Sequence, residues 1–169
     1  MGSSIVIMGV SGCGKSSLGA AVARAEVLPL IEGDDHHSEQ SRSKMSQGIA
    51  LTDEDRDGWL TLLGEQLGAS PNGAVLTCSA LKHKYREHLR AASPGLRFVF
   101  LDLTREEAQA RVSSRSAHFF SASLVDSQFA ALESPVGEPG VLRVDATAPL
   151  GELQSQVSDW LKTVALPQS

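Results

Sequence analysis

The sequence is poor in cysteine and has no long apolar run. Only Cys13 and Cys78 occur among 169 residues. Two cysteines cannot build the disulfide framework of a small secreted domain, so we expect two reduced thiols. No apolar segment approaches the roughly 20 residues that a membrane-spanning helix needs, and the amino terminus lacks the basic start of a signal peptide. These absences predict a cytoplasmic protein with no membrane partner.

An excess of positive charge is also missing. Fifteen lysines and arginines are outnumbered by 20 aspartates and glutamates, which gives a formal net charge of −5 at pH 7. Proteins that bind nucleic acid usually carry a basic surface, so no nucleic-acid partner is predicted. An acidic chain can still bind a small anion through a local cluster of cations.

What the sequence does contain is a regular alternation of two kinds of segment. Apolar runs predict strands, and stretches with helical periodicity separate them. Strands are expected at residues 4–8, 28–31, 74–78, 97–101 and 141–144, and helices at residues 15–25, 53–67, 82–92, 105–114, 123–132 and 150–164. Thr104 and Glu107 predict a capping box at one helix start. Nearly continuous apolar strands alternating with helices predict an α/β fold with a parallel sheet, in one domain spanning residues 1–169.

The most specific motif is a phosphate-binding loop. Gly9-Val-Ser-Gly-Cys-Gly14-Lys15-Ser16 matches G-x-x-x-x-G-K-[ST] and lies between an expected strand and an expected helix. Backbone N–H groups of such a loop surround phosphates, and the following helix adds positive potential. Lys15 is predicted to reach the phosphates and Ser16 to hold Mg²⁺. The predicted nucleotide contacts are Gly12, Cys13 (through its backbone), Gly14, Lys15, Ser16 and Ser17.

The loop by itself leaves three classes open: a small-molecule kinase, a GTPase-type switch and a nucleotide-binding module without catalysis. Guanine recognition uses N-K-x-D. The single asparagine, Asn72, is followed by Gly73, so this motif is absent. The GTPase class is therefore disfavoured.

Two charged residues after the second expected strand are candidates for the acceptor site. Asp34 lies where a carboxylate can act as a base or organise Mg²⁺, although aspartate is also common in turns. Arg56 stands among four carboxylates. It can clamp a substrate carboxylate or belong to a solvated charge cluster at a helix start.

A basic cluster follows the third expected strand. Its members are Lys82, Lys84, Arg86 and Arg90, with Glu87 as the only acid among them. The cluster favours an anionic acceptor, and the alternative is an exposed helix face. Ser79 is placed either to cap the helix or to bind a hydroxyl.

Together these blocks resemble the thermoresistant-type gluconokinases over nearly the whole chain. The resemblance rests on the phosphate loop and on further blocks at matching spacings: Glu32-Gly-Asp34 with His37, Lys44-Met45 with Gly48, Leu51-Thr-Asp-Glu-Asp-Arg56 with Trp59, Cys78-Ser-Ala-Leu-Lys82 with Tyr85-Arg86, and Arg111 through Arg115 to His118-Phe119-Phe120. Shikimate kinases look similar in architecture but lack the Cys-Ser-Ala-Leu-Lys and His-Phe-Phe segments.

The resemblance implies a nucleoside-monophosphate-kinase-like fold whose five parallel strands run in the order 2-3-1-4-5. It implies an acceptor region at about residues 34–68 and a lid at about residues 111–122. The implied reaction is phosphorylation of D-gluconate to 6-phospho-D-gluconate with ATP and Mg²⁺, in a homodimer. Alternatives are a kinase of another small anionic acceptor, such as a shikimate-like one, and a non-catalytic nucleotide-binding protein.

The resemblance also implies roles for single residues. Asp34 would accept or orient the proton of the gluconate 6-hydroxyl. Cations for the carboxylate would come from Arg56, Lys82 and Arg86, and hydrogen bonds to hydroxyls from His37 and Ser79.

The segment that the resemblance implies as a lid contains two arginines. Arg111 and Arg115 would stabilise the transferring phosphoryl group, although Arg111 also fits an ordinary ion-pair partner on a helix face. Because no acidic residue ends the strand at 74–78, Mg²⁺ would depend on Ser16, phosphates, water and Asp34.

Overall fold

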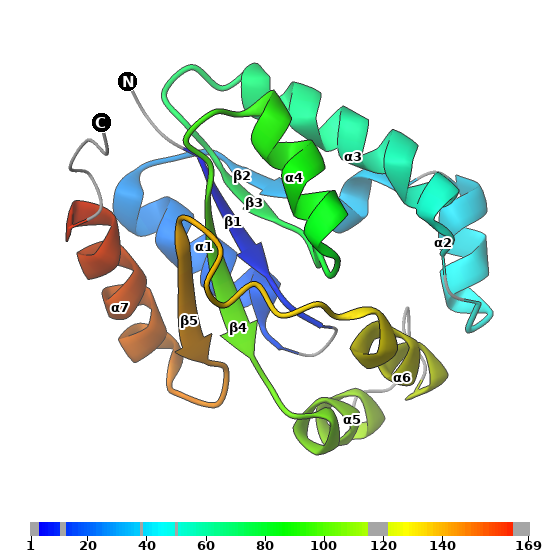
Figure 1. Ribbon diagram of the computed structural model, residues 1–169. Helices are drawn as coiled ribbons and strands as arrows, with labels where there is room; N and C mark the ends of the chain where they lie inside the picture. The colour runs from blue at the N-terminus through cyan, green and yellow to red at the C-terminus, as the bar shows by residue number, and fades with distance from the viewer. Residues whose placement is uncertain (1–3, 11–12, 38, 50, 115–121, 164–169) are drawn as a thin grey trace.

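The computed structural model describes residues 4–10, 13–37, 39–49, 51–114 and 122–163. Five parallel strands form one sheet in the order β2-β3-β1-β4-β5, with helices on both faces (Figure 1). The strands are β1 (Ile5–Met8), β2 (Leu30–Glu32), β3 (Val75–Thr77), β4 (Arg97–Asp102) and β5 (Val141–Asp145). The predicted fold class and strand order are confirmed.

Helices cover the two faces as the crossover connections require. They are α1 (Lys15–Glu26), α2 (Glu39–Ser46), α3 (Asp53–Gly68), α4 (His83–Ala92), α5 (Arg105–Ser114), α6 (Ala122–Ala131) and α7 (Leu150–Thr163), with a short 3₁₀ helix, η1 (Gly33–His36), after β2. No helix in the described part of the chain is long and apolar enough to cross a bilayer.

The central strand β1 explains why its sequence is apolar without interruption. All four of its residues are buried. Ile5 and Ile7 pack into the core that α1 and α7 cover, and Val6 and Met8 pack into the core that α3 and α4 cover. A strand with a helical layer on each side has no solvent face, so polar residues are excluded from it.

Helix starts were only partly predictable. The capping box at α5 is confirmed, because the Thr104 amide donates to Glu107 Oε1 at 3.0 Å and the Glu107 amide donates to Thr104 Oγ1 at 3.1 Å. A second box at α3 was missed: Thr52 and Asp55 make the same pair of bonds at 2.9 and 3.1 Å. The usual pattern has Glu or Gln at the fourth position, whereas this box uses the shorter aspartate.

The elements η1 and α2 were also missed. Helix α2 has only eight residues, and Ser41 and Met45 are the ones it buries. So short and polar a segment gives almost no periodic apolar signal. Both elements follow β2, and they extend the chain over the edge of the sheet at which the parallel strands end. In such sheets ligands bind outside the carboxyl ends of the strands.

Candidate active site

The phosphate loop follows β1 and depends on glycine at two described positions. Gly9 has φ 150°, and a Cβ there would lie 2.7 Å from Cys13 Sγ and 2.9 Å from the Leu101 carbonyl oxygen. Gly14, the N-cap of α1, has φ 96°. Gly12 lies outside the described residues. The Cys13 side chain is buried in the core, and burial raises the pKa of its thiol. Cys13 can therefore present only its backbone to a ligand.

Lys15 begins α1, and among the described residues the partners of its ammonium group are neutral. Its Nζ donates to the carbonyl oxygens of Gly9 at 3.1 Å and Val10 at 3.2 Å. Ser16 and Ser17 follow in the first turn and are exposed. That turn contains no acidic residue of its own, and the positive end of the helix dipole lies there. The loop thus offers a cation and a helix N-terminus to a phosphate group.

A carboxylate that the analysis of the sequence did not single out lies beside Ser16. Glu32, at the end of β2, accepts hydrogen bonds on Oε1 from Ser16 Oγ at 3.0 Å and from Thr77 Oγ1 at 2.6 Å. Oxygen ligands of this kind suit Mg²⁺. The described residues contain no cluster of three or more His, Cys, Asp or Glu that could hold a metal ion. Mg²⁺ would therefore need phosphate oxygens and water in addition to Ser16 and Glu32.

No acidic residue ends β3, and the carboxylate that contacts Ser16 comes from the neighbouring strand β2. Glu32 stands next to Asp34 in one of the blocks that resemble gluconokinases. Only the tertiary arrangement of the strands brings Glu32 to the phosphate loop.

The acceptor side begins at η1. Asp34 belongs to this turn, but its side chain lies outside the described part of the structure. His37 is buried and stacks on Trp59, with ring centroids 4.1 Å apart and 19° between the planes. Trp59 Nε1 in turn donates to the Gly33 carbonyl oxygen at 2.8 Å. These contacts fix the start of the acceptor region against α3.

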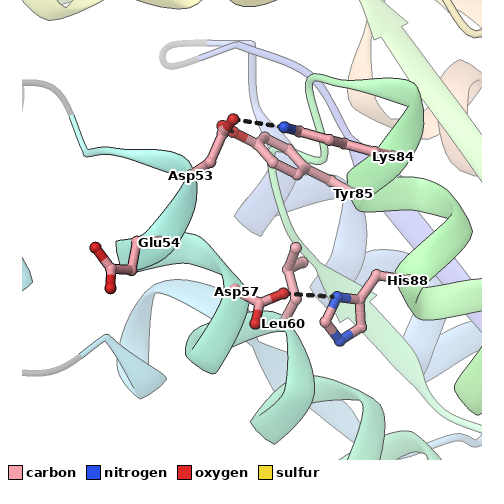
Figure 2. A pocket seen from close by; sticks show the side chains of 7 residues that line it. All are labelled: Asp53, Glu54, Asp57, Leu60, Lys84, Tyr85 and His88. Atoms are coloured by element: carbon pink, nitrogen blue, oxygen red, sulfur yellow. Dashed lines mark hydrogen bonds and ion pairs between the residues drawn. The ribbon is translucent and has the colours of Figure 1, made fainter.

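Three lysines near the predicted acceptor site are paired with carboxylates. Lys82 Nζ lies 3.1 Å from Asp53 Oδ1, and Lys44 Nζ lies 2.8 Å from Asp55 Oδ2. Lys84 also bonds Asp53, at 2.5 Å, and Figure 2 shows its ammonium pointing at that carboxylate. Hydrogen bonds from Lys84, Tyr85 and Lys82 hold the pKa of Asp53 far below its usual value. The bond from Lys44 and that from the Thr52 backbone lower the pKa of Asp55 to about 2.

Two cations approach the Tyr85 ring. The Arg56 guanidinium carbon lies 5.5 Å and Lys82 Nζ lies 5.7 Å from the ring centroid. Arg56 differs from Lys82 and the other two lysines in its carboxylate contacts. Within the described residues no carboxylate forms an ion pair with it. Arg56 is thus the predicted acceptor cation whose charge is not cancelled.

A groove of about 380 Å³ lies between the first turns of α3 and α4 (Figure 2). Its lining residues are Asp53, Glu54, Asp57, Leu60, Lys84, Tyr85 and His88. Its charged groups are largely paired with one another, as in the contact of 3.4 Å between His88 Nδ1 and Asp57 Oδ1.

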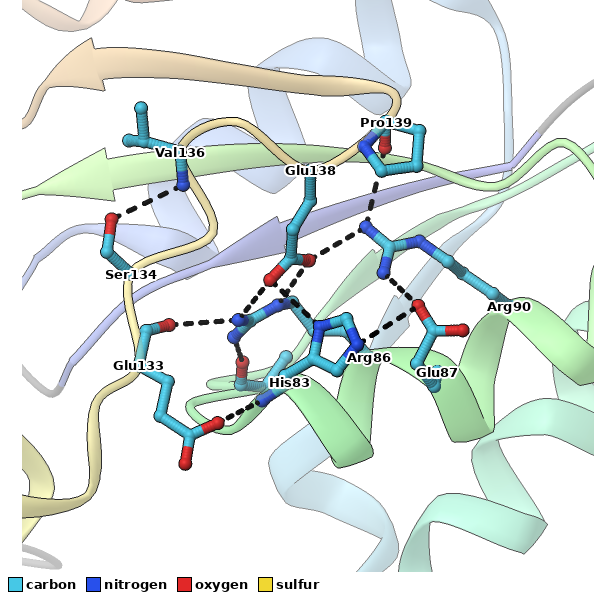
Figure 3. Close-up of polar contacts among 10 residues, drawn as sticks. His83, Arg86, Glu87, Arg90, Glu133, Ser134, Val136, Glu138 and Pro139 are labelled. Atoms are coloured by element: carbon cyan, nitrogen blue, oxygen red, sulfur yellow. Dashed lines mark hydrogen bonds and ion pairs between the residues drawn. The ribbon is translucent and has the colours of Figure 1, made fainter.

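Arg86, a predicted cation for the substrate carboxylate, has its guanidinium engaged within the protein. The side chain is fully buried and surrounded by partners (Figure 3). Its Nε and Nη2 donate to the Glu138 carboxylate at 2.9 and 2.6 Å, its Nη1 to the Ala80 carbonyl oxygen at 2.8 Å, and its Nη2 also to the Glu133 carbonyl oxygen at 2.9 Å. The basic cluster has an acidic partner after all, far along the chain.

Glu138 is the centre of this network. It also accepts bonds from Arg90 at 3.0 Å and from His83 at 3.1 Å. Burial opposes its charged form, but the bonds from Arg86, His83 and Arg90 outweigh burial and lower the pKa of Glu138 to about 2. The network fastens the segment after α6 to α4.

Ser79 does not cap α4, so the capping role that the sequence allowed for Ser79 is wrong. The N-cap is Lys82, without a side-chain bond, and the His83 amide instead donates to Glu133 Oε1 at 2.8 Å. Ser79 is half-buried, and binding of a hydroxyl stays a prediction for it.

Of the predicted lid, the structure describes only the ends. Arg111 lies in the last turn of α5, and its Nη2 donates to the Ala146 carbonyl oxygen, just after β5, at 3.1 Å. The Arg111 charge lowers the pKa of the Cys13 thiol, against the larger effect of burial. Arg115 lies outside the described residues.

Known proteins that are similar to this chain show the family to which it belongs. A family model described as shikimate kinase matches residues 11–128. The chain is 40% identical to the thermosensitive gluconokinase of Escherichia coli K12 over 159 residues, which cover 92% of this chain and 85% of that protein. The chain belongs to the gluconokinase family. A gluconokinase of Gluconobacter oxydans is 44% identical over 144 residues, covering 83% of this chain and 80% of that protein.

A solved structure agrees with this membership. The crystal structure of a gluconokinase from Sinorhizobium meliloti 1021 is 42% identical, with a TM-score of 0.85, and the match covers 97% of this chain and 98% of that one. The suspected gluconokinase resemblance is therefore confirmed, and the shikimate kinase model reflects the P-loop kinase architecture that the two groups share.

Proposed function

We propose that the protein transfers the γ-phosphoryl group of ATP to the 6-hydroxyl of D-gluconate, giving ADP and 6-phospho-D-gluconate. The observation that carries this proposal is the identity to proteins named gluconokinase over most of the chain. Support comes from the site, where a phosphate loop and a cation without a carboxylate partner lie at the same edge of the sheet.

At the nucleotide end, the chain supplies positive charge that is not cancelled. Lys15 can exchange its two carbonyl partners for oxygens of the β- and γ-phosphates, because these described partners carry no charge. Ser16 and Glu32 would hold Mg²⁺, directly or through water. When bound, Mg²⁺ neutralises charge that develops on the phosphates during transfer.

At the acceptor end, Arg56 would bind the carboxylate of gluconate through two parallel N–H donors, a geometry that guanidinium and carboxylate share. Lys82 would contribute less, because Asp53 already neutralises it. His37 and Ser79 would bind hydroxyl groups. Asp34 would accept or orient the proton of the 6-hydroxyl, and Arg111 and Arg115 would stabilise the transferring group.

A coupled assay of ADP release across D-gluconate, shikimate and nucleoside monophosphates tests the proposal. Gluconate should be the preferred acceptor, with Lys15→Ala as the inactive control. Preference for shikimate would instead support the alternative of another anionic acceptor, and release of ADP with no acceptor at all would refute both.

The role of Asp34 has its own test. Asp34→Asn should lower kcat far more than it raises the KM for gluconate, since a base acts mainly in the transition state. A raised KM with an unchanged kcat would make Asp34 a binding residue instead.

We also propose a cytoplasmic homodimer, on the family resemblance. Light scattering coupled to size-exclusion chromatography should give twice the chain mass of 17.9 kDa. A monomeric mass at micromolar concentration would contradict the dimer.

A further inference from the structure

Tyr85 lines the groove of Figure 2. Packing holds its ring, and a hydrogen bond holds its hydroxyl. The side chain is 5% exposed and packs in the core under α3 and α4. Its hydroxyl donates to Asp53 Oδ1 at 2.5 Å, and the figure shows hydroxyl and carboxylate in contact. Burial is the largest cause that raises the pKa of Tyr85, followed by the bond to Asp53. The phenol therefore stays protonated and keeps donating.

Arg56 stands over this ring even though acidic residues surround it in the sequence. Three of the four acids around it in the sequence are engaged elsewhere. Asp53 is bonded by Lys82, Lys84 and Tyr85, and Asp55 by Lys44 and the Thr52 amide. Asp57 Oδ1 lies 3.4 Å from His88 Nδ1. Among the described residues, the contact of the Arg56 guanidinium is with the Tyr85 ring. Its guanidinium carbon lies 5.5 Å from the ring centroid.

An aromatic ring and a carboxylate hold a guanidinium in different ways. A carboxylate cancels its charge and occupies its N–H donors, so an incoming anion would have to displace it. The face of a ring attracts the cation through its quadrupole and takes no N–H donor. A guanidinium held by a ring is oriented and still free to bind a carboxylate at two points.

We propose that Tyr85 is a positioning residue for acceptor binding: its ring orients the Arg56 guanidinium without neutralising it, so that Arg56 can receive the carboxylate of a sugar acid. Asp53 completes the device, because it anchors the hydroxyl and thereby the tilt of the ring. This inference rests on the proposed function and deepens it by naming what specifies the carboxylate end of the acceptor.

The test compares Tyr85→Phe with Tyr85→Leu in steady-state kinetics of the full chain. Leucine removes the ring and should raise the KM for gluconate roughly 3- to 30-fold, the range expected for a lost cation–π contact. The kcat and the KM for ATP should stay within about threefold of wild type. Phenylalanine keeps the ring face and loses only the bond to Asp53, so its effect should be the smaller of the two.

A double-mutant cycle separates positioning from structure. In the background of Arg56→Ala, Tyr85→Leu should raise the KM for gluconate no further, because the group that it positions is gone. Leu89→Ala is the matched control. Leu89 lies on the same helix and in the same core, so its loss destabilises α4 and should leave the KM for gluconate unchanged.

Pentafluorophenylalanine at position 85 covers the case in which the leucine variant does not fold. Fluorination removes the negative face of the ring and nearly preserves its shape, so this variant should show a raised KM relative to Tyr85→Phe. The inference is overturned if the KM for gluconate does not change, or if the change is equally large without Arg56. Absence of gluconate turnover by the wild type would refute the proposed function and this inference with it. Wild-type turnover with unaffected Tyr85 variants would refute the inference alone.

Discussion

Two groups of cations near the carboxyl edge of the sheet are held in opposite ways. Around α4, Arg86 and Arg90 are bonded to the ionised carboxylate of Glu138. At the phosphate loop and the start of α3, Lys15 contacts two carbonyl oxygens and Arg56 contacts an aromatic ring. A charged partner fixes a cation and cancels its charge, whereas a neutral partner fixes it and leaves the charge for a ligand.

The comparison teaches how to choose among the basic residues of an acidic chain. Arg56 and Arg86 are both arginines of helices beside the proposed acceptor site. Arg86 bridges α4 to a distant loop, and its removal would leave buried acceptors without donors. Arg56 has no such structural task among its described contacts. Arg86 should therefore matter for stability, and Arg56 for ligand binding.

Lys15→Ala should show the largest effect. We expect turnover to fall by about 10³-fold or more, because this cation acts on charge that develops in the transition state. The melting temperature should barely change, since only two backbone carbonyls lose a partner. Steady-state kinetics beside thermal unfolding check this. Turnover within tenfold of wild type would remove Lys15 from the group of ligand-binding cations.

Arg86→Met should be the most destabilising change. Breaking a buried ion pair from one side costs about 3–5 kcal/mol in the free energy of unfolding, and urea denaturation measures it. At a temperature where the variant is folded, the KM for gluconate should stay within threefold of wild type. A stable variant with a greatly raised KM would return Arg86 to the acceptor site.

Arg56→Ala should show the reverse pattern. A hydrogen-bonded contact between charged groups contributes about 1.5–3 kcal/mol, so the KM for gluconate should rise roughly 10- to 100-fold. The free energy of unfolding should change by no more than about 0.5 kcal/mol, as for an ordinary surface substitution. Loss of stability without a change in KM would place Arg56 among the structural cations.

Acid should weaken the network of Glu138. Its pKa in the folded protein is about 2, below the ordinary value of 4.5, so its stabilising contribution is present above pH 4.5 and is lost as the pH falls toward 2. Glu138→Gln cannot be protonated. Its deficit in unfolding free energy relative to wild type should be largest near neutral pH and should shrink across this window. Parallel curves for the two proteins, from urea titrations at several pH values, would contradict the assignment.

Asp53→Asn should have the smallest effect. It tests directly whether a carboxylate partner keeps a lysine from binding a ligand. It removes the charge that neutralises Lys82 and Lys84, so two further cations without this carboxylate partner appear beside Arg56. Inhibition by a dicarboxylate such as D-glucarate should then strengthen roughly threefold, the size of a partly screened surface charge pair. Asp57→Asn, on the same helix and in the same groove, is the control and should have no effect. Equal inhibition of all three proteins would show that Lys82 lies outside the acceptor site.

The sequence alone predicted the five strands, six of the helices, the phosphate loop and the capping box at Thr104. These features depend on periodicity and on contacts within a few residues, which a single chain displays directly. The strand order came from the family resemblance. The polar helix α2 escaped because its periodic apolar signal is too weak.

Which cations can bind a ligand depends on contacts between segments that are distant in the sequence. The bond from Arg86 to Glu138 spans 52 residues, that from Lys84 to Asp53 spans 31, and that from Thr77 to Glu32 spans 45. Local pattern cannot predict such pairs, because the packing of one helix or strand against another chooses them. The charge that a residue offers to a ligand depends on its partners in space, and those are settled when the layers close on the sheet.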